Sequence, residues 1–433
     1  MYLASVERPA GTIDRTKRIA ANVFALGAVS LVTDVSSEMV TAILPLYLVV
    51  GLGLGPAAYG LVDGLYTGAT ALLRLAGGYL ADRIRRRKLV AGIGYAMSAF
   101  AKIGLLVAGP SLGGIGAAVI ADRAGKGLRT APRDALITLA TPPADLGRAF
   151  GVHRAMDSAG AFAGPLVALA VLAGSGQAFD AVFVVSGCVA AIGVLILVLF
   201  VRDHRAPAVD PVSAVDRMPA GRRGAGGQRS AAAGSNGVDL RSAGALLRIA
   251  PIRWLLFGAI LLGLSTIGDG FVYLLLQRRE NLAVGWFPLL AVGTSLAYLL
   301  LAVPLGTLAD RIGRPVVFLG GYAALAAVYL LLTTRWGGLP ALVTVLFLYG
   351  VFYAATDGVL MALAAPLLPA ELRTTGLALI QTGQALAYLV SSVLFGVAWA
   401  RWDAAGATRF AAIAGVVTLA GWATLLRRTR RAA

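Results

Sequence analysis

Long apolar runs, separated by short polar or Gly- and Pro-rich connections, make up most of the chain. Runs of about 20 apolar residues can cross a bilayer as helices, whereas the alternating strands of about 10 residues that a membrane-spanning barrel needs are missing from the sequence. We therefore expect an all-α membrane protein with twelve transmembrane helices. They begin near Ile19, Tyr59, Leu89, Leu112, Ala149, Ala181, Arg253, Phe287, Pro315, Leu339, Thr375 and Phe410.

Composition supports this pattern. Of the 433 residues, 58% are hydrophobic and 14% are charged, whereas soluble domains contain about 25% charged residues. The net charge of +17 would suit a nucleic-acid partner, but the cations lie between the apolar runs, as topology determinants do. We therefore expect a lipid bilayer around the protein and no nucleic acid. Cys188 is the single cysteine, so neither a disulfide nor a cysteine-based metal site is encoded.

The positions of Lys and Arg predict the orientation. Cations are concentrated before the first helix, in "RRRK" at residues 85–88 and in the closing "RRTRR", while the opposite loops of the first half hold none. Cytoplasmic loops carry such an excess of positive charge. We expect a multi-pass protein of the plasma (inner) membrane with both termini in the cytoplasm. The polar N-terminal stretch is too long for a cleavable signal, so the first helix should be retained.

Short motifs recur at nearly constant spacing. Two such copies stand at the ends of apolar runs, "LADRI" at residues 80–84 and again at residues 308–312. Collinear repeats with an even number of helices predict two parallel six-helix halves. The other pairs are "GY" at 94–95 and 321–322, "PADL" at 143–146 with "PAEL" at 369–372, and Ser30–Asp34 with Ser265–Asp269.

The domain boundaries follow from the same pattern. Residues 203–249 are rich in Gly, Ala, Ser and Arg without periodicity, which is typical of a flexible linker. We predict a cytoplasmic N-terminus at 1–18, an N-terminal six-helix bundle at 19–202, a cytoplasmic linker at 203–249, a C-terminal bundle at 250–427 and a cytoplasmic tail at 428–433.

The duplicated motif resembles that of the major facilitator superfamily, and the resemblance covers nearly the whole chain. The family's loop between helices two and three reads G-x-x-x-D-R-x-G-R-[RK]. The resemblance implies a major facilitator fold of two bundles related by a pseudo-two-fold axis, secondary transport by alternating access, a monomer, and gating by this motif. The first copy, "GYLADRIRRRK", supplies Gly78, Asp82 and Arg83 but has Arg85 where glycine is usual; the second, "GTLADRIGRP", supplies Gly306, Asp310, Arg311, Gly313 and Arg314.

The gating aspartates need positive partners, because the C-terminal end of a helix disfavours negative charge. By pseudo-symmetry we expect Asp82 to dock near Thr375 on helix eleven and Asp310 near Arg148 on helix five, which would hold the inner side shut. The run "DRAGKGLRTAPRDA" is also similar to a poorly characterised bacterial and archaeal branch of the superfamily. Some relatives in that branch are associated with iron handling.

Acidic residues within apolar runs are functional candidates, because burying a charge there costs about 2.5 kcal/mol or more. "SLVTDVSSEM" places Asp34 and Glu38 on one face of helix one, Asp269 is the repeat mate of Asp34, and Asp357 falls in the middle of helix ten. We expect these acids to couple transport to protons, the alternative being structural pairing with a buried cation. Arg123 matches the helix-four arginine of the family, which the resemblance ties to proton handling.

Further charged residues lie in helices two to five. Asp122, Lys126, Arg129 and Arg133 are spaced to share one face of helix four. We expect Arg129 to reach the cytoplasmic surface, and His153 to be hydrogen-bonded near it. The residues that we expect to line a substrate cavity are Arg74, Lys102, Asp122, Lys126 and Asp157.

Helix five carries Gly160, Gly164 and Pro165 in a pattern that resembles the antiporter motif of the family. Ala168 and Leu169 replace its closing glycines. Small residues and a proline in this pattern are equally typical of close helix packing with a bend, and both interpretations stay open.

Enzymatic activity is disfavoured by incomplete motifs. "AGKG" lacks the earlier glycine and the following Ser/Thr of a phosphate-binding loop, and no Cys/His/Met cluster supports a metal. We expect no cofactor and no metal. The acids favour proton-coupled antiport, that is, efflux of a small amphipathic or cationic compound. The cations Arg74, Lys102, Arg123 and Lys126 would instead suit uptake of an organic anion or an iron-chelate-like solute.

Overall fold

The computed structural model describes residues 20–84, 86–142, 145–203, 246–368 and 373–431, with the backbone alone at 74–84, 365, 373–375 and 423–431. In these ranges every regular element is a helix, so the expected all-α class is confirmed. The first half comprises α1 (Ala21–Leu46), its π-helical extension η1 (Tyr47–Gly51), α2 (Pro56–Ile84), α3 (Arg87–Ala108), α4 (Leu112–Leu139), α5 (Leu146–Gly174) and α6 (Phe179–Phe200). The second half comprises α9 (Ala250–Leu264), α10 (Asp269–Arg279), η3 (Val284–Trp286), α11 (Pro288–Ile312), α12 (Arg314–Thr333), α13 (Gly338–Thr356), α14 (Val359–Ala364), η4 (Ala365–Leu367) and α15 (Arg373–Arg431).

Helix ends follow from local sequence. Gly109 adopts φ 50° and ends α3, a conformation that glycine accepts without a steric penalty. Two residues later the Ser111 hydroxyl accepts a hydrogen bond from the Gly114 amide at 3.2 Å, which caps α4. This pair of signals makes the tight reversal between the two helices.

Nine segments of the described chain are long and apolar enough to cross a membrane. One of them, α15, is broken at Asp403 (φ 72°, ψ 175°) and doubles back, because Gly383 and Trp422 both lie against the middle of α9. With α2 and α4, and with α15 counted as two helices, these ranges contain the twelve helices that the sequence predicts.

Two of the predicted helices are interrupted. The seventh predicted helix is divided between Leu264 and Asp269 into α9 and α10. The tenth is divided at Asp357 and Gly358 (φ 75°) into α13 and α14. Asp357 therefore occupies a break rather than the middle of a helix. Side chains from other helices hydrogen-bond the backbone of the first break, because buried peptide groups need partners. Ile267 N donates to Tyr329 Oη (2.9 Å), Tyr349 Oη donates to Ile267 O (3.2 Å), and Ser391 Oγ donates to Thr266 O (2.8 Å).

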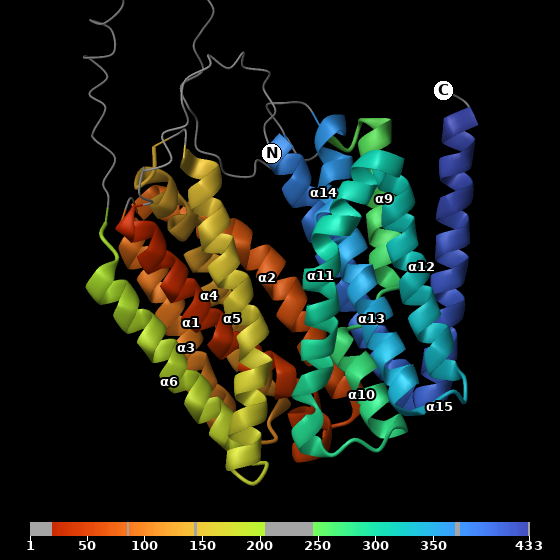
Figure 1. Cartoon of the computed structure of the whole chain (residues 1–433), viewed down its shortest axis with the longest axis horizontal. Helices are drawn as coiled ribbons and strands as arrows, with labels where there is room; N and C mark the ends of the chain where they lie inside the picture. Colours follow the sequence, from red (N-terminus) through yellow and green to blue (C-terminus); the bar gives the residue numbers. More distant parts are fainter. Residues whose placement is uncertain (1–19, 85, 143–144, 204–245, 369–372, 432–433) are drawn as a thin grey trace, which may run out of the picture.

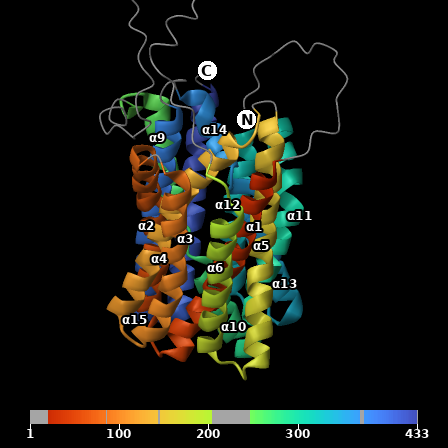
Figure 2. The same cartoon turned by 90° about the vertical axis from the view of Figure 1, so that its left-hand side faces the viewer.

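Helices α1–α6 form one group and α9–α15 the other (Figures 1 and 2). α1 begins and α15 ends on the same side of the bundle, the upper side in Figure 1; we call this the termini side. The opposite side, which carries Gly55 and Asp403, is called the loop side.

The two halves meet closely toward the loop side. A Cβ atom added at Gly64 of α2 would lie 2.9 Å from the carbonyl oxygen of Leu389 in α15, and one at Gly396 would lie 3.1 Å from the Cα of Ala57. Glycine at these positions lets the helix backbones approach. Phe271 of α10 fills the centre of this contact, with its ring 4.6 Å from that of Tyr59 and 4.9 Å from that of Phe395. We refer to residues 56–68 of α2 and 389–399 of α15, with Phe271, as the loop-side seal.

Candidate functional site

A cavity of about 840 Å³ lies between the two halves. It ends at the loop-side seal, where Tyr59 and Asp63 line it, and extends to Leu360 and Met361 of α14, which lies toward the termini side (Figure 1). Among the described residues, the hydroxyls and rings of seven tyrosines form much of its wall: Tyr59, Tyr66, Tyr273, Tyr298, Tyr322, Tyr353 and Tyr388.

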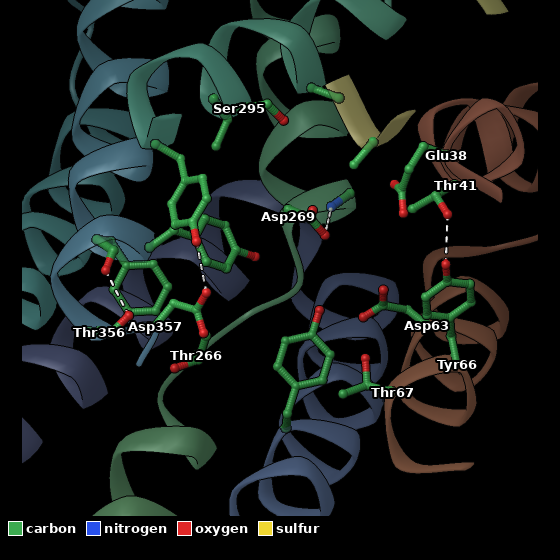
Figure 3. A pocket seen from close by; sticks show the side chains of 18 of the residues that line it. Glu38, Thr41, Asp63, Tyr66, Thr67, Thr266, Asp269, Ser295, Thr356 and Asp357 are labelled. Atoms are coloured by element: carbon green, nitrogen blue, oxygen red, sulfur yellow. Dashed lines mark hydrogen bonds between the residues drawn. The ribbon is translucent and has the colours of Figure 1, made fainter. Parts of the chain in front are cut away.

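Four carboxylic acids line this cavity in the described part of the chain: Glu38, Asp63, Asp269 and Asp357. Figure 3 shows Glu38 and Asp63 on one side of the cavity, Asp357 across from them and Asp269 between. Sequence reasoning selected three of them and missed Asp63. The signal was present, because Asp63 is an acid inside the apolar run of the second predicted helix, and such residues are functional candidates.

Asp63 and Asp357 are held in different ways. The Asp357 Oδ2 atom accepts a hydrogen bond from Tyr298 of the same half at 3.0 Å. Asp63 accepts hydrogen bonds from Tyr59 (3.4 Å) and, across the two halves, from the Ser392 hydroxyl of α15.

Lys126 is the one basic residue among the described lining residues. Lys102 and Asp122, which the sequence suggested as lining residues, lie behind the wall instead. The Lys102 ammonium is 2.5 Å from Asp122 Oδ1, and Asp122 also binds Arg123. Arg123 in turn lies 3.7 Å from the ring centre of Tyr66, a lining residue, and does not itself line the described cavity. The side chain of Arg74 lies outside the described residues.

Asp34 and Asp157 belong to a second polar cluster between α1, α4 and α5. Arg129 Nη2 lies 3.9 Å from Asp34 Oδ1, and Arg133 Nη1 lies 3.8 Å from Asp157 Oδ1 and 3.3 Å from Ser30 Oγ. We call Asp34, Arg129, Arg133 and Asp157 the α1–α4–α5 cluster. It does not contribute to the lining of the described cavity.

Two expectations for this region are wrong. Arg129 does not reach the surface: it is 3% exposed, because the ring of Tyr95, 4.6 Å away, covers its guanidinium. His153 is also 3% exposed, and neither ring nitrogen has a hydrogen-bond partner in the described structure. His153 belongs to α5, which packs along α1.

Gly160 and Gly164 bring α5 into contact with α1. A Cβ atom at Gly160 would lie 2.9 Å from the carbonyl carbon of Leu31, and one at Gly164 would lie 2.8 Å from the carbonyl oxygen of Val35. Pro165 lines the cavity. The motif therefore packs α5 onto the stretch of α1 that carries Asp34 and Glu38.

The second gating motif is visible at the junction of α11 and α12. Gly313 adopts φ 103° there, which explains a glycine at that position. Asp310 pairs with Arg314 one turn later at 3.2 Å, and Arg314 also donates to Ala362 O at 2.8 Å. In the first copy only the backbone of Gly78, Asp82 and Arg83 is described, and the side chain of Thr375 also lies outside the described residues.

Sequence and structure comparisons agree with this architecture. A family profile described as Major Facilitator Superfamily matches residues 26–288 and 280–433. An uncharacterized MFS-type transporter of Methanocaldococcus jannaschii is 29% identical over 397 residues, which cover 89% of this chain and 90% of the relative. A crystal structure of the nucleoside transporter NupG superposes with a TM-score of 0.75 at 14% identity, over 94% of this chain and 99% of that one. A bacterial homolog of the human lysosomal transporter Spinster, inward-facing and unoccupied, superposes with a TM-score of 0.67 at 15% identity, over 92% and 94%. These two structures share the fold.

Proposed function

Since the chain belongs to the major facilitator superfamily and is a secondary membrane transporter of small molecules rather than an enzyme, we propose that it exchanges protons for a small organic cation. Its substrate would be a cationic or amphipathic compound, exported by alternating access of the central cavity to the two sides of the membrane.

The charge of the cavity carries this proposal. Glu38, Asp63, Asp269 and Asp357 face it together with Lys126 alone among the described cations. In a site with low dielectric, an excess of carboxylates attracts a cation and repels an anion. The tyrosine faces add a favourable surface for an organic cation.

Uptake of an organic anion has weaker support. It would draw on Arg74, Lys102, Arg123 and Lys126. Lys102 and Arg123 share the single carboxylate of Asp122 behind the cavity wall. One of their two positive charges is thereby compensated, and neither side chain lines the described cavity.

Proton coupling follows from competition at the cavity acids. A carboxylate can hold a proton or neutralise the substrate's cation, but not both at once. This mutual exclusion of proton and substrate is the minimal requirement for exchange. Glu38 and Asp269 suit this role because neither has an ion-pair partner within 4 Å among the described residues. We infer that Asp34 and Asp157, with Arg129 and Arg133, provide a second proton site toward the termini side, and that Arg123 acts on the cavity through Tyr66.

The alternation would proceed from the arrangement described here. Because the Lys and Arg pattern favours a cytoplasmic termini side, we assign this arrangement, sealed on the loop side, as inward-facing in the plasma membrane. Closing the termini side would then bring Asp82 toward α15 and Asp310 toward α5, where the gating motif would latch the halves of a monomer.

The test uses purified protein in liposomes with an imposed pH gradient. Ethidium, as a cation, should accumulate in the more acidic compartment as protons leave it, and p-aminohippurate, as an anion, should not. Asp269→Asn should abolish the accumulation. Glu280→Gln is the matched control, because Glu280 pairs with Arg279 at 3.3 Å and does not line the described cavity. Anion accumulation together with protons would reverse the proposal.

A further inference from the structure

Asp63 occupies the boundary between the cavity and the loop-side seal. It stands between Gly60 and Gly64, two of the α2 glycines that touch α15, and its carboxylate also lines the cavity (Figure 3). A single side chain is thus accessible to whatever enters the cavity and is part of the contact that closes the opposite side.

The contacts of Asp63 join the two halves. Ser392 of α15 donates a hydrogen bond to Oδ2, and Tyr59 of α2 donates one to Oδ1. A Cβ atom at Gly268 would lie 3.1 Å from Asp63 Cγ and 2.7 Å from Tyr388 Oη. The carboxylate therefore rests on the unwound segment between α9 and α10, at a position that only glycine leaves open. Hydrogen bonds to a buried carboxylate are stronger than those to a neutral group.

No cation offsets the charge of Asp63 within 4 Å in the described structure. The titratable groups that face it are Tyr59 of α2, Asp269 of α10, Tyr388 of α15 and Tyr353 of α13. An acidic residue without a cation is the natural receptor for a proton or for the cationic group of a substrate. Either would compete with Ser392 for the same carboxylate oxygens.

We propose that Asp63 couples the content of the cavity to the loop-side seal. With its carboxylate ionised and unoccupied, Asp63 binds Ser392 and keeps the seal shut. A proton or a substrate cation on Asp63 displaces Ser392 and lets the seal open. The empty carrier therefore cannot open toward the loop side, and this is the condition that makes exchange obligatory. The inference rests on the proposed cation–proton exchange, which it deepens by assigning the residue that enforces it.

The experiment measures opening rather than transport. Spin labels are placed at Gly55, where an added Cβ meets nothing within 4 Å, and at Ala405, which is exposed just after the turn at Asp403. Cys188 is replaced by serine, and a second pair at Gly147 and Thr307 reports on the termini side. Double electron–electron resonance in detergent or nanodiscs then gives the distance distribution at each pH.

We expect the 55–405 distance in the parent protein to be short at high pH and to lengthen as the pH falls. Asp63→Asn should show the long distance at every pH, with the open-to-closed ratio raised roughly tenfold, as for one lost hydrogen bond to a buried charge. Ser392→Ala should shift the ratio in the same direction. Glu280→Gln is the matched control, because the contacts of Glu280 with Arg279 and the Gly338 amide stay within one half and it does not line the described cavity; it should behave like the parent.

Parent-like distances in both Asp63→Asn and Ser392→Ala would overturn the proposal, as would an unchanged pH response in Asp63→Asn. If Asp63→Asn does not give a monodisperse protein, Ser392→Ala decides. If liposomes show no proton exchange but opening still depends on Asp63, the proposed cation–proton exchange is rejected. The role of Asp63 in the loop-side seal would then stand.

Discussion

The ammonium group of Lys102 in α3 lies 2.5 Å from Oδ1 of Asp122 in α4, and the Lys102 side chain is only 2% exposed. Asp122 binds Arg123 with its other oxygen, so one carboxylate serves two buried cations. Arg123 lies against the back of Tyr66, a lining residue. The positive charges of Lys102 and Arg123 are thereby held behind the wall of the cavity, and four acids face the described cavity with Lys126.

This shared carboxylate predicts an unequal response to mutation. Asp122→Asn leaves two buried cations without their acid, and removing one partner of a buried pair costs about 3–5 kcal/mol. Lys102→Met should cost less, because Asp122 keeps Arg123. Thermal unfolding of the purified protein checks the order. Asp310→Asn is the control: its pair with Arg314 is 68% and 40% exposed, and exposed pairs contribute about 0–1 kcal/mol. Equal losses for all three variants would contradict this account.

Lys126 distinguishes the two substrate classes. It is the cation among the described lining residues, so Lys126→Gln makes the cavity more negative. For a cationic substrate we expect tighter binding, by roughly tenfold for a like charge removed at short range. For an anion, binding should be lost. Fluorescence titration of ethidium against the purified variant measures the change, and weaker ethidium binding would argue against a cationic substrate.

Gly164 should tolerate no side chain. A Cβ atom there would lie 2.5 Å from that of Glu38, so Gly164→Ala must push α5 away from α1, at a cost of about 1–3 kcal/mol for overpacking. Gly151→Ala in the same helix meets nothing within 4 Å and should leave stability unchanged or slightly higher. Melting temperature and liposome transport should both fall for Gly164→Ala. If the two variants match, the close α1–α5 contact is not what requires glycine.

The break in the seventh helix should depend on Tyr329. Its hydroxyl accepts from Ile267 N at 2.9 Å and donates to Ser265 O at 3.2 Å. Tyr329→Phe leaves both backbone groups buried without that partner, which costs about 1–3 kcal/mol. Tyr95→Phe removes a buried hydroxyl that has no hydrogen-bond partner among the described residues, and should be neutral. Amide hydrogen exchange over residues 264–270 should rise in Tyr329→Phe alone; protection as in the parent would refute the role of Tyr329.

Much of the fold could be predicted from the sequence, because its signals are local. Apolar runs set the helices, and Gly109 and Ser111 mark the ends of two of them within four residues. The acids Glu38 and Asp269 stand out because an apolar run makes any carboxylate conspicuous. The breaks at Ser265–Gly268 and Asp357–Gly358 differ from the continuous helices that the sequence predicts. The backbone of the first break is bonded by Tyr329, Tyr349 and Ser391 from other helices, which a local pattern does not reveal.

Which charges face the cavity was decided only by the tertiary structure. A helical repeat places Asp122 and Lys126 on one face of α4, yet Asp122 turns to Lys102 of α3 while Lys126 reaches the cavity. Asp63 meets Ser392 across 329 positions of sequence. Hydropathy and spacing determine that a residue is buried in a membrane helix. Its partner depends on how the helices pack, because the energy of a buried charge is set by neighbours that are distant along the chain.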